Sequence, residues 1–234
     1  MGSPDRQPRI VMLGPPASGK GTHGKSLASQ LGVTYLSTGA LLRQQVQGNT
    51  RLGQIAAPIL EQGLYLPDGV MCDVIDDWLR QHPGGWVLDG FPRSEAQAKF
   101  LDDRLAAVSL RLDAAVALQV TLPELRHRIA GRVECPACHW SGPSIQSDHG
   151  NCPDCGRAVT ARPDDHEENF LSRHREFERL TLPAIDYYRR RGCLLPLDAS
   201  GSRDAVAARL RQCLESGFVP GLARQCPSLK SCPS

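Results

Sequence analysis

Aromatic residues are scarce in this chain of 234 residues, at 5% of the total. A platform on which nucleic acid bases stack needs several aromatic side chains, so this scarcity argues against such a platform. The net charge is also small, because 27 Lys and Arg face 25 Asp and Glu, which leaves +2. A near-neutral balance lacks the basic excess that attracts phosphate backbones and anionic membrane surfaces. We therefore expect neither nucleic acid nor a membrane as a partner.

Long apolar runs are missing as well, since no segment approaches the roughly 18 residues that a membrane span requires. The N-terminal residues 1–5 (MGSPD) lack the apolar core of a secretion signal. The nine cysteines are an odd number, which does not suit an extracellular disulfide framework. We expect a soluble, cytoplasmic, monomeric protein. Its length allows one domain with inserted lobes or two small domains.

The chain is organised around a glycine-bounded loop at residues 14–22 (GPPASGKGT), between the apolar run Ile10–Leu13 and a helical segment ending near Leu31. The elements follow in the order strand, loop, lysine and helix. In this order a phosphate group can be bound jointly by the N–H groups of the loop, the N-terminus of the helix and the charge of Lys20. The spacing fits the G-x-x-x-x-G-K pattern, although Gly21 stands where many such loops have Ser or Thr. The alternative is a Gly/Pro turn that precedes a helix.

Short apolar strands alternate with helical segments along most of the chain. Strands are expected at 9–13, 33–36, 86–88, 114–120 and 194–197, and helices at 20–31, 40–46, 52–61, from 68 to the break at Pro83, 95–105, from a capping box at 121–124 to 131, 164–190 and 203–214. This alternation predicts an α/β fold of three layers, in which helices cover both faces of a five-stranded parallel sheet.

The segments 37–66 and 132–163 interrupt the alternation and are predicted to cross over the ligand edge, where parallel strands end. Asp89 ends an apolar strand at this edge, so it is expected to face the phosphate loop and to order water around Mg²⁺. The alternative for Asp89 is a turn or capping role.

Phosphoryl transfer needs positive charge on both donor and acceptor phosphates and little acid–base catalysis, so no general base is nominated. Arg128 and Arg132 are four residues apart, which predicts that both side chains lie on one face of the helix that leads into the second interrupting segment, residues 132–163. Each arginine alone is typical of a solvated surface charge. Together, six of them border one predicted cleft: Arg43, Arg93, Arg128, Arg132, Arg162 and Arg173.

Two C-x-x-C pairs, Cys135–Cys138 and Cys152–Cys155, lie in the segment 132–163. Four thiolates at this spacing can bind one tetrahedral Zn²⁺, and a closed Cys₄ site is structural. The metal would stiffen a lobe that is too small for its own core. A redox dithiol or two disulfides are the alternatives, and His139 and His149 are possible competing ligands. The other cysteines have no partner spacing and are expected to be ordinary thiols: Cys72, Cys193, Cys213, Cys226 and Cys232.

Several motifs jointly resemble the adenylate kinase family over roughly residues 9–212, in the family's order. They are Gly14-x-Pro16-x-x-Gly19-Lys20-Gly21-Thr22, Ser37-Thr38-Gly39 with Arg43, Asp89-Gly90-Phe91-Pro92-Arg93 with Gln97, and Arg162-Pro163-Asp164-Asp165. The resemblance implies reversible transfer of the γ-phosphoryl group of MgATP to AMP, giving two ADP. It also implies a P-loop core (1–36, 67–130 and 164–215), a helical AMP-binding lobe (37–66) and a zinc-binding lid (131–163). The sequence beyond the last helix, residues 216–234, is expected to be a flexible tail.

The resemblance further implies roles for single residues. ATP would be bound by Ala17, Ser18, Gly19, Lys20, Gly21, Thr22, Arg128 (against adenine) and Ser141. AMP would be bound by Thr38, Arg43, Leu64, Tyr65, Leu66, Gly90, Phe91, Pro92, Arg93, Gln97, Arg162 and Arg173. The catalytic set would be Lys20, Asp89, Arg93, Arg132, Arg162 and Arg173. Asp164 and Asp165 would orient lid arginines through ion pairs, with helix N-capping as the alternative.

The chain departs from the family pattern at two places. Ala40 stands where the family usually has Asp, so Asp89 is expected to hold Mg²⁺-bound water alone. In the lid, Ser141-Gly142 replaces a frequent Ser/Thr-Tyr, and Trp140 is the candidate for the missing aromatic contact.

Two rival functions follow from the same residues. One is a kinase for another nucleoside monophosphate, although the Gln97 amide suits adenine because it can donate and accept. The other is a zinc-ribbon nucleic acid binder with an ATP-dependent switch, which the charge and the few aromatics oppose.

Overall fold

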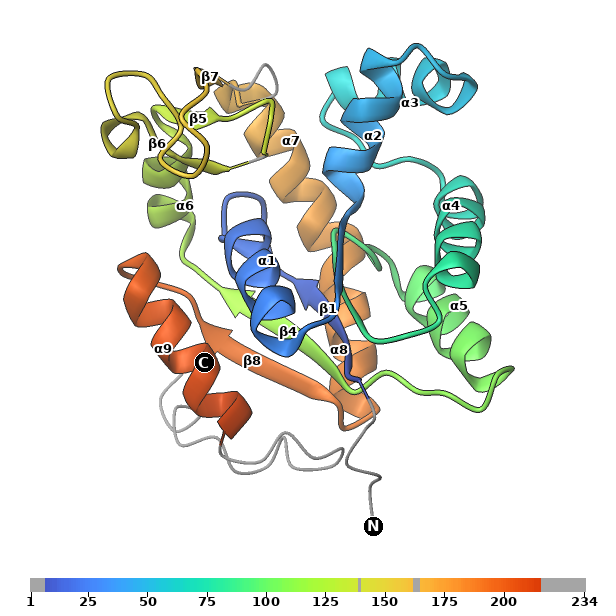
Figure 1. Ribbon diagram of the computed structural model, residues 1–234. Coiled ribbons are helices and arrows are strands. Elements are labelled where there is room, and N and C mark those ends of the chain that lie inside the picture. The colour runs from blue at the N-terminus through green and yellow to red at the C-terminus, as the bar shows by residue number, and fades with distance from the viewer. Residues whose placement is uncertain (1–6, 139, 162–164, 216–234) are drawn as a thin grey trace.

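A computed structural model describes residues 7–138, 140–161 and 165–215 of the chain. Its centre is a five-stranded sheet in the order β2-β3-β1-β4-β8, with every neighbouring pair parallel. This sheet confirms the α/β prediction (Figure 1). The strands are β1 (Arg9–Leu13), β2 (Thr34–Ser37), β3 (Trp86–Asp89), β4 (Ala114–Gln119) and β8 (Leu194–Asp198).

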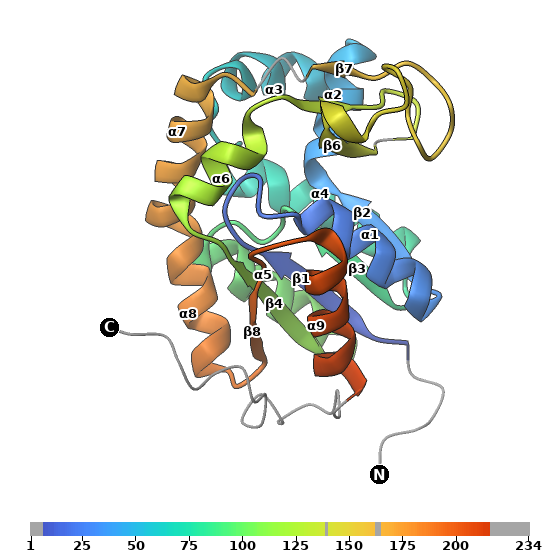
Figure 2. The same cartoon turned by 90° about the vertical axis from the view of Figure 1, so that its left-hand side faces the viewer.

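Helices cover both faces of the sheet, which is why its central strands are apolar along their whole length. Ile10 and Met12 of β1 pack toward α1 and α9, whereas Val11 and Leu13 pack into the cluster that includes α4, α5 and α8. Figure 2 shows the sheet between these two helix layers. The helices are α1 (Lys20–Leu31), α4 (Asp68–Gln81), α5 (Glu95–Ala106), α8 (Leu182–Arg190) and α9 (Arg203–Glu215).

Two excursions stand over the carboxyl ends of the strands, on either side of the view in Figure 1. The helical arm, residues 38–61, consists of α2 (Thr38–Gln47) and α3 (Arg51–Glu61). The cysteine lobe, residues 132–161, holds an antiparallel sheet in the order β6-β5-β7 and the short helix η1 (Ser144–Gln146). Its strands, β5 (Arg132–Glu134), β6 (Ser141–Pro143) and β7 (Thr160–Ala161), are too short to show a period, so sequence reasoning missed this sheet.

The helix that enters the cysteine lobe, α6 (Leu122–Ile129), ends earlier than expected. Gly131 has a φ of +71° and turns the chain, so Arg132 lies on β5. The prediction that Arg128 and Arg132 share one helix face was therefore wrong. The capping box was also wrong, because the Thr121 side chain makes no cap hydrogen bond. The Glu124 carboxylate instead accepts hydrogen bonds from Arg128 and from the Gly201 N–H, at 2.6 and 3.0 Å.

A long helical run links the cysteine lobe to β8. It begins at α7 (Glu167–Glu176), later than the predicted start at Asp164, and continues through the π-helical turn η2 (Phe177–Thr181) into α8. A wide turn is expected here because Pro183, in the first turn of α8, has no N–H to donate. None of the helices in the described ranges is long and apolar enough to span a membrane.

Candidate active site

The phosphate loop joins β1 to α1 as the sequence predicted. The Lys20 ammonium lies back over the loop, where Nζ donates to the carbonyl oxygens of Gly14 and Pro15 at 2.8 and 2.7 Å. Helix α1 begins at Lys20 behind Gly19, and its first turn carries no acidic side chain. The positive end of the helix and a lysine charge therefore meet at one place, which suits a bound phosphate.

The charge around Lys20 comes from several elements. Burial lowers the pKa of Lys20 to about 8; the Asp89 carboxylate opposes this shift, and Arg93, Arg132 and Arg173 add to it. These effects require the three guanidinium groups and the carboxylate to lie near the ammonium. The structure thus brings four cations together at the ligand edge with Asp89 and with Asp165, which pairs with Arg132 and Arg173.

Asp89 is the last residue of β3 and is opposite Met12 of β1 and Ser37 of β2. Only 8% of the residue is exposed, and Oδ2 accepts a hydrogen bond from the Tyr35 hydroxyl at 3.0 Å. Burial and the neighbouring Asp89 charge raise the pKa of Tyr35, so the phenol stays protonated. Sequence reasoning treated Tyr35 only as part of a strand.

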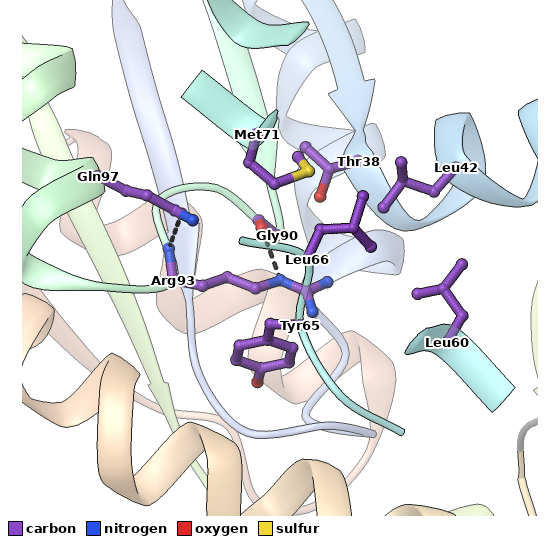
Figure 3. A pocket seen from close by; sticks show the side chains of 9 residues that line it. All are labelled: Thr38, Leu42, Leu60, Tyr65, Leu66, Met71, Gly90, Arg93 and Gln97. Carbon is purple, nitrogen blue, oxygen red and sulfur yellow. Dashed lines mark hydrogen bonds between the residues drawn. The ribbon is translucent and has the colours of Figure 1, made fainter. Parts of the chain in front are cut away.

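A pocket opens between the helical arm and the core (Figure 3). Arg93 crosses it, with its guanidinium 4.2 Å from the centre of the Tyr65 ring, and its Nε donates to the Gly90 carbonyl at 2.7 Å. Apolar side chains and one amide complete the lining, which suits a flat ring with polar edges beside a negative group. The lining residues are Thr38, Leu42, Leu60, Tyr65, Leu66, Met71, Gly90, Arg93 and Gln97.

The Gln97 amide is held in one orientation from two sides. Its Oε1 accepts from the Arg93 backbone N–H, and its Nε2 donates to Asp68 Oδ1, both at 2.7 Å. The Ser94 hydroxyl donates to the other Asp68 oxygen at 2.6 Å. The sequence analysis assigned Asp68 only to the start of a helix. Its position two residues after Leu66, which lines the pocket, is the signal that could have linked Asp68 to the site.

Gly90 is required by close packing at this pocket. A Cβ there would lie 2.4 Å from Thr38 Oγ1, and its φ is +85°. The Thr38 hydroxyl in turn donates to the Asp89 carbonyl at 3.2 Å. The pocket wall at Thr38 and the Asp89 backbone therefore depend on the same close packing around Gly90.

The predicted arginines mostly face carboxylates or carbonyls. Arg43 of α2 pairs with Glu134 of the cysteine lobe at 3.1 Å, so the two excursions are in contact. Arg132 and Arg173 both pair with Asp165, and His166, not Asp165, occupies the N-cap of α7. Arg128 donates to the Ala199 carbonyl at 2.6 Å and to the Ser18 carbonyl at 3.3 Å. Arg162 and Asp164 lie outside the described residues.

Other predicted residues are placed away from the pocket lining. The Phe91 side chain is fully buried in the core, while 37% of Leu64 is exposed. Ser141 lies on β6. Trp140 is buried inside the cysteine lobe with Cys135 and Cys152, so it does not supply an aromatic surface.

The four predicted metal ligands form a cluster in which all sulfur atoms lie within 4.8 Å of one another: Cys135, Cys138, Cys152 and Cys155. Sγ of Cys135 and Cys155 are 3.5 Å apart, and those of Cys138 and Cys152 are 3.4 Å apart. A tetrahedral ZnS₄ site has sulfur–sulfur distances of about 3.8 Å, so the cluster fits zinc after a small adjustment. The cluster also borders the core, because Lys25 Nζ of α1 donates to the Cys138 carbonyl at 3.0 Å.

Known proteins resemble this chain over most of its length. The family model described as adenylate kinase matches residues 12–193. The adenylate kinase of Thermodesulfovibrio yellowstonii is 36% identical over 206 residues, covering 85% of this chain and 94% of the relative. That of Streptomyces avermitilis is 37% identical over 213 residues, covering 88% and 97%. The chain therefore belongs to the adenylate kinase family.

Proposed function

We propose that the protein transfers the γ-phosphoryl group of MgATP to AMP, reversibly giving two ADP. The observation that carries this proposal is the pocket of Gln97 and Arg93 beside the phosphate loop. A phosphate donor on the loop and a nucleoside monophosphate in the pocket would place their phosphates on either side of Arg93. Positioning and charge neutralisation are the main demands of phosphoryl transfer, and this arrangement meets both.

In this proposal the phosphate loop and Arg128 hold ATP, and Lys20, Arg93, Arg132 and Arg173 neutralise the transferring phosphoryl group. Arg162 belongs to the same proposed set. Residues 37–66, which include the helical arm, are the proposed AMP-binding lobe, and residues 131–163, which include the cysteine lobe, are the proposed lid. When both close over the substrates, water is excluded, so that AMP accepts the phosphoryl group.

Two metal ions belong to the proposal. Mg²⁺ would be held through water by Asp89 and would neutralise charge on the ATP phosphates. Zn²⁺ would be held by the cysteine cluster, and its closed set of four thiolates gives it a structural role. A cytoplasmic location and a monomeric state stay predictions of the sequence.

A substrate panel tests the proposed function. With ATP and Mg²⁺ present, AMP should give ADP at a far higher kcat/KM than CMP, UMP or GMP, because Gln97 can pair with the adenine edge. The measurement is a coupled assay of ADP formation with each monophosphate. Preference for another monophosphate would replace the AMP assignment, and salt-sensitive nucleic acid binding without AMP-dependent ATP consumption would favour the zinc-ribbon rival.

Asp68 gives a second prediction about AMP. Asp68→Ala removes the acceptor that orients the Gln97 amide, so the KM for AMP should rise about 10-fold, the equivalent of one hydrogen bond. The KM for ATP should stay within about twofold, because Asp68 lies on the monophosphate side. Asp73→Ala, an exposed aspartate on the same helix, is the matched control. Equal rises in both KM values would contradict this role.

A further inference from the structure

Tyr35 makes the hydrogen bond from β2 that fixes the proposed magnesium carboxylate. Its hydroxyl donates to Asp89 Oδ2 at 3.0 Å, across two neighbouring parallel strands. A carboxylate offers two oxygens and about four acceptor positions. One neutral donor on Oδ2 therefore orients the group and leaves Oδ1 for a metal-bound water.

The first turn of α1 lies directly over this hydrogen bond. A Cβ on Gly21 would lie 3.4 Å from Asp89 Oδ2 and 3.6 Å from the Tyr35 hydroxyl. Gly21 also follows Lys20, the residue that closes the phosphate loop. The Tyr35–Asp89 pair is thus part of the floor of the phosphate site.

A second glycine of α1 makes room for the tyrosine ring. Gly24 is buried inside the helix, where glycine is less favourable than alanine by roughly 0.5–1 kcal/mol. A Cβ at Gly24 would lie 3.1 Å from Tyr35 Cε2 and 3.2 Å from Met12 Cγ, which is too close for ordinary packing. Helix α1 therefore has glycine, which lowers helix stability, at the position that the Tyr35 ring contacts.

The carboxylate of Asp89 has no acidic neighbour at Ala40, in the first turn of α2. Ala40 contributes only its N–H to the Ser37 hydroxyl there, at 3.3 Å. We propose that Tyr35 is a positioning residue for magnesium, which holds the Asp89 carboxylate in one orientation through this hydrogen bond, so that this single carboxylate can hold metal-bound water without an acidic side chain at position 40. The proposal rests on the proposed role of Asp89 in phosphoryl transfer.

Tyr35→Phe keeps the ring and removes only the hydroxyl. We expect the free Mg²⁺ concentration for half-maximal activity to rise about 10-fold, as for other groups that orient a metal ligand. At saturating Mg²⁺ the turnover should return to within about threefold of the unmodified protein. In calorimetry, ADP binding in the presence of Mg²⁺ should weaken, whereas ADP binding in EDTA should be unchanged.

Tyr187→Phe is the matched control, because the Tyr187 hydroxyl donates to Asp102 at 2.9 Å, and neither residue belongs to the cleft. Ala40→Asp in the Tyr35→Phe background should restore the Mg²⁺ dependence. Tyr35→Phe overturns the proposal if its Mg²⁺ dependence matches that of the control, or if binding falls equally with Mg²⁺ and with EDTA. The proposed function fails separately, if the unmodified protein forms no ADP.

Discussion

Lys20→Ala is expected to lower the turnover of ATP and AMP by about 10³-fold, the upper range for loss of one preorganised charge donor. Lys20 is the only described lysine within the phosphate loop, and its Nζ is already directed over the loop by the Gly14 and Pro15 carbonyl oxygens. The fold should persist, because the Lys20 ammonium donates its hydrogen bonds to loop carbonyl oxygens. Its removal therefore leaves no hydrogen-bonded carboxylate without a partner among the described residues. Steady-state kinetics with a melting curve checks both statements.

The lowered pKa of Lys20 adds a test that does not depend on turnover. Above its pKa of about 8, Lys20 in the empty loop is mostly neutral, and a bound phosphate anion would raise that pKa. ADP binding at pH 9 should therefore take up a proton, which calorimetry in two buffers of different ionisation enthalpy detects. Lys99→Ala, an exposed lysine on α5, should keep the uptake and the activity. Near-normal turnover of Lys20→Ala would refute its role.

Cys135→Ser is expected to release zinc and to lower the melting temperature. A ligand present at a thousand times its Kd stabilises a folded protein by about 4 kcal/mol. For a chain of this size, that loss corresponds to a shift on the order of 10 °C. Cys135 is fully buried within the cysteine lobe, whose small core consists mainly of these cysteines and Trp140, so few other contacts compensate.

Metal analysis and calorimetric melting measure the two effects. Cys72→Ser is the control, because Cys72 is a half-buried thiol on α4, away from the sulfur cluster, and burial raises its pKa to about 11. It should retain about one zinc per chain. The assignment of a metal site fails if the unmodified protein contains no zinc near one equivalent.

The sequence predicted most of the core because its signals are local. The apolar runs before Gly14, Gly90 and Asp198 each form a strand of the sheet, and the glycine-bounded loop lies between β1 and α1. The cysteine spacing likewise predicted a cluster, since four sulfur atoms converge. These features depend on residues that are close in sequence or on a repeated pattern.

Several errors and omissions came from contacts between residues far apart in the sequence. The Thr121 capping box matched its pattern, but Glu124 bonds Gly201 and Arg128 instead of closing the box. The bonds from Tyr35 to Asp89 and from Gln97 to Asp68 join different elements and leave no spacing in the sequence. The helix start at Glu167 was missed because Asp165 pairs with Arg132 and Arg173 in place of capping.

The carboxylates that already pair with the arginines also compete with any anion that enters the cleft. Arg43 holds Glu134, and Arg173 holds Asp165, so an incoming phosphate competes with an internal counter-ion for these two guanidinium groups, whereas the Lys20 ammonium donates to loop carbonyl oxygens. Singly charged anions that bind through one contact gain too little from this exchange, whereas a phosphoryl group carries more charge and several acceptor oxygens. The resting cleft therefore discriminates by competition, and common buffer anions should inhibit the protein only weakly.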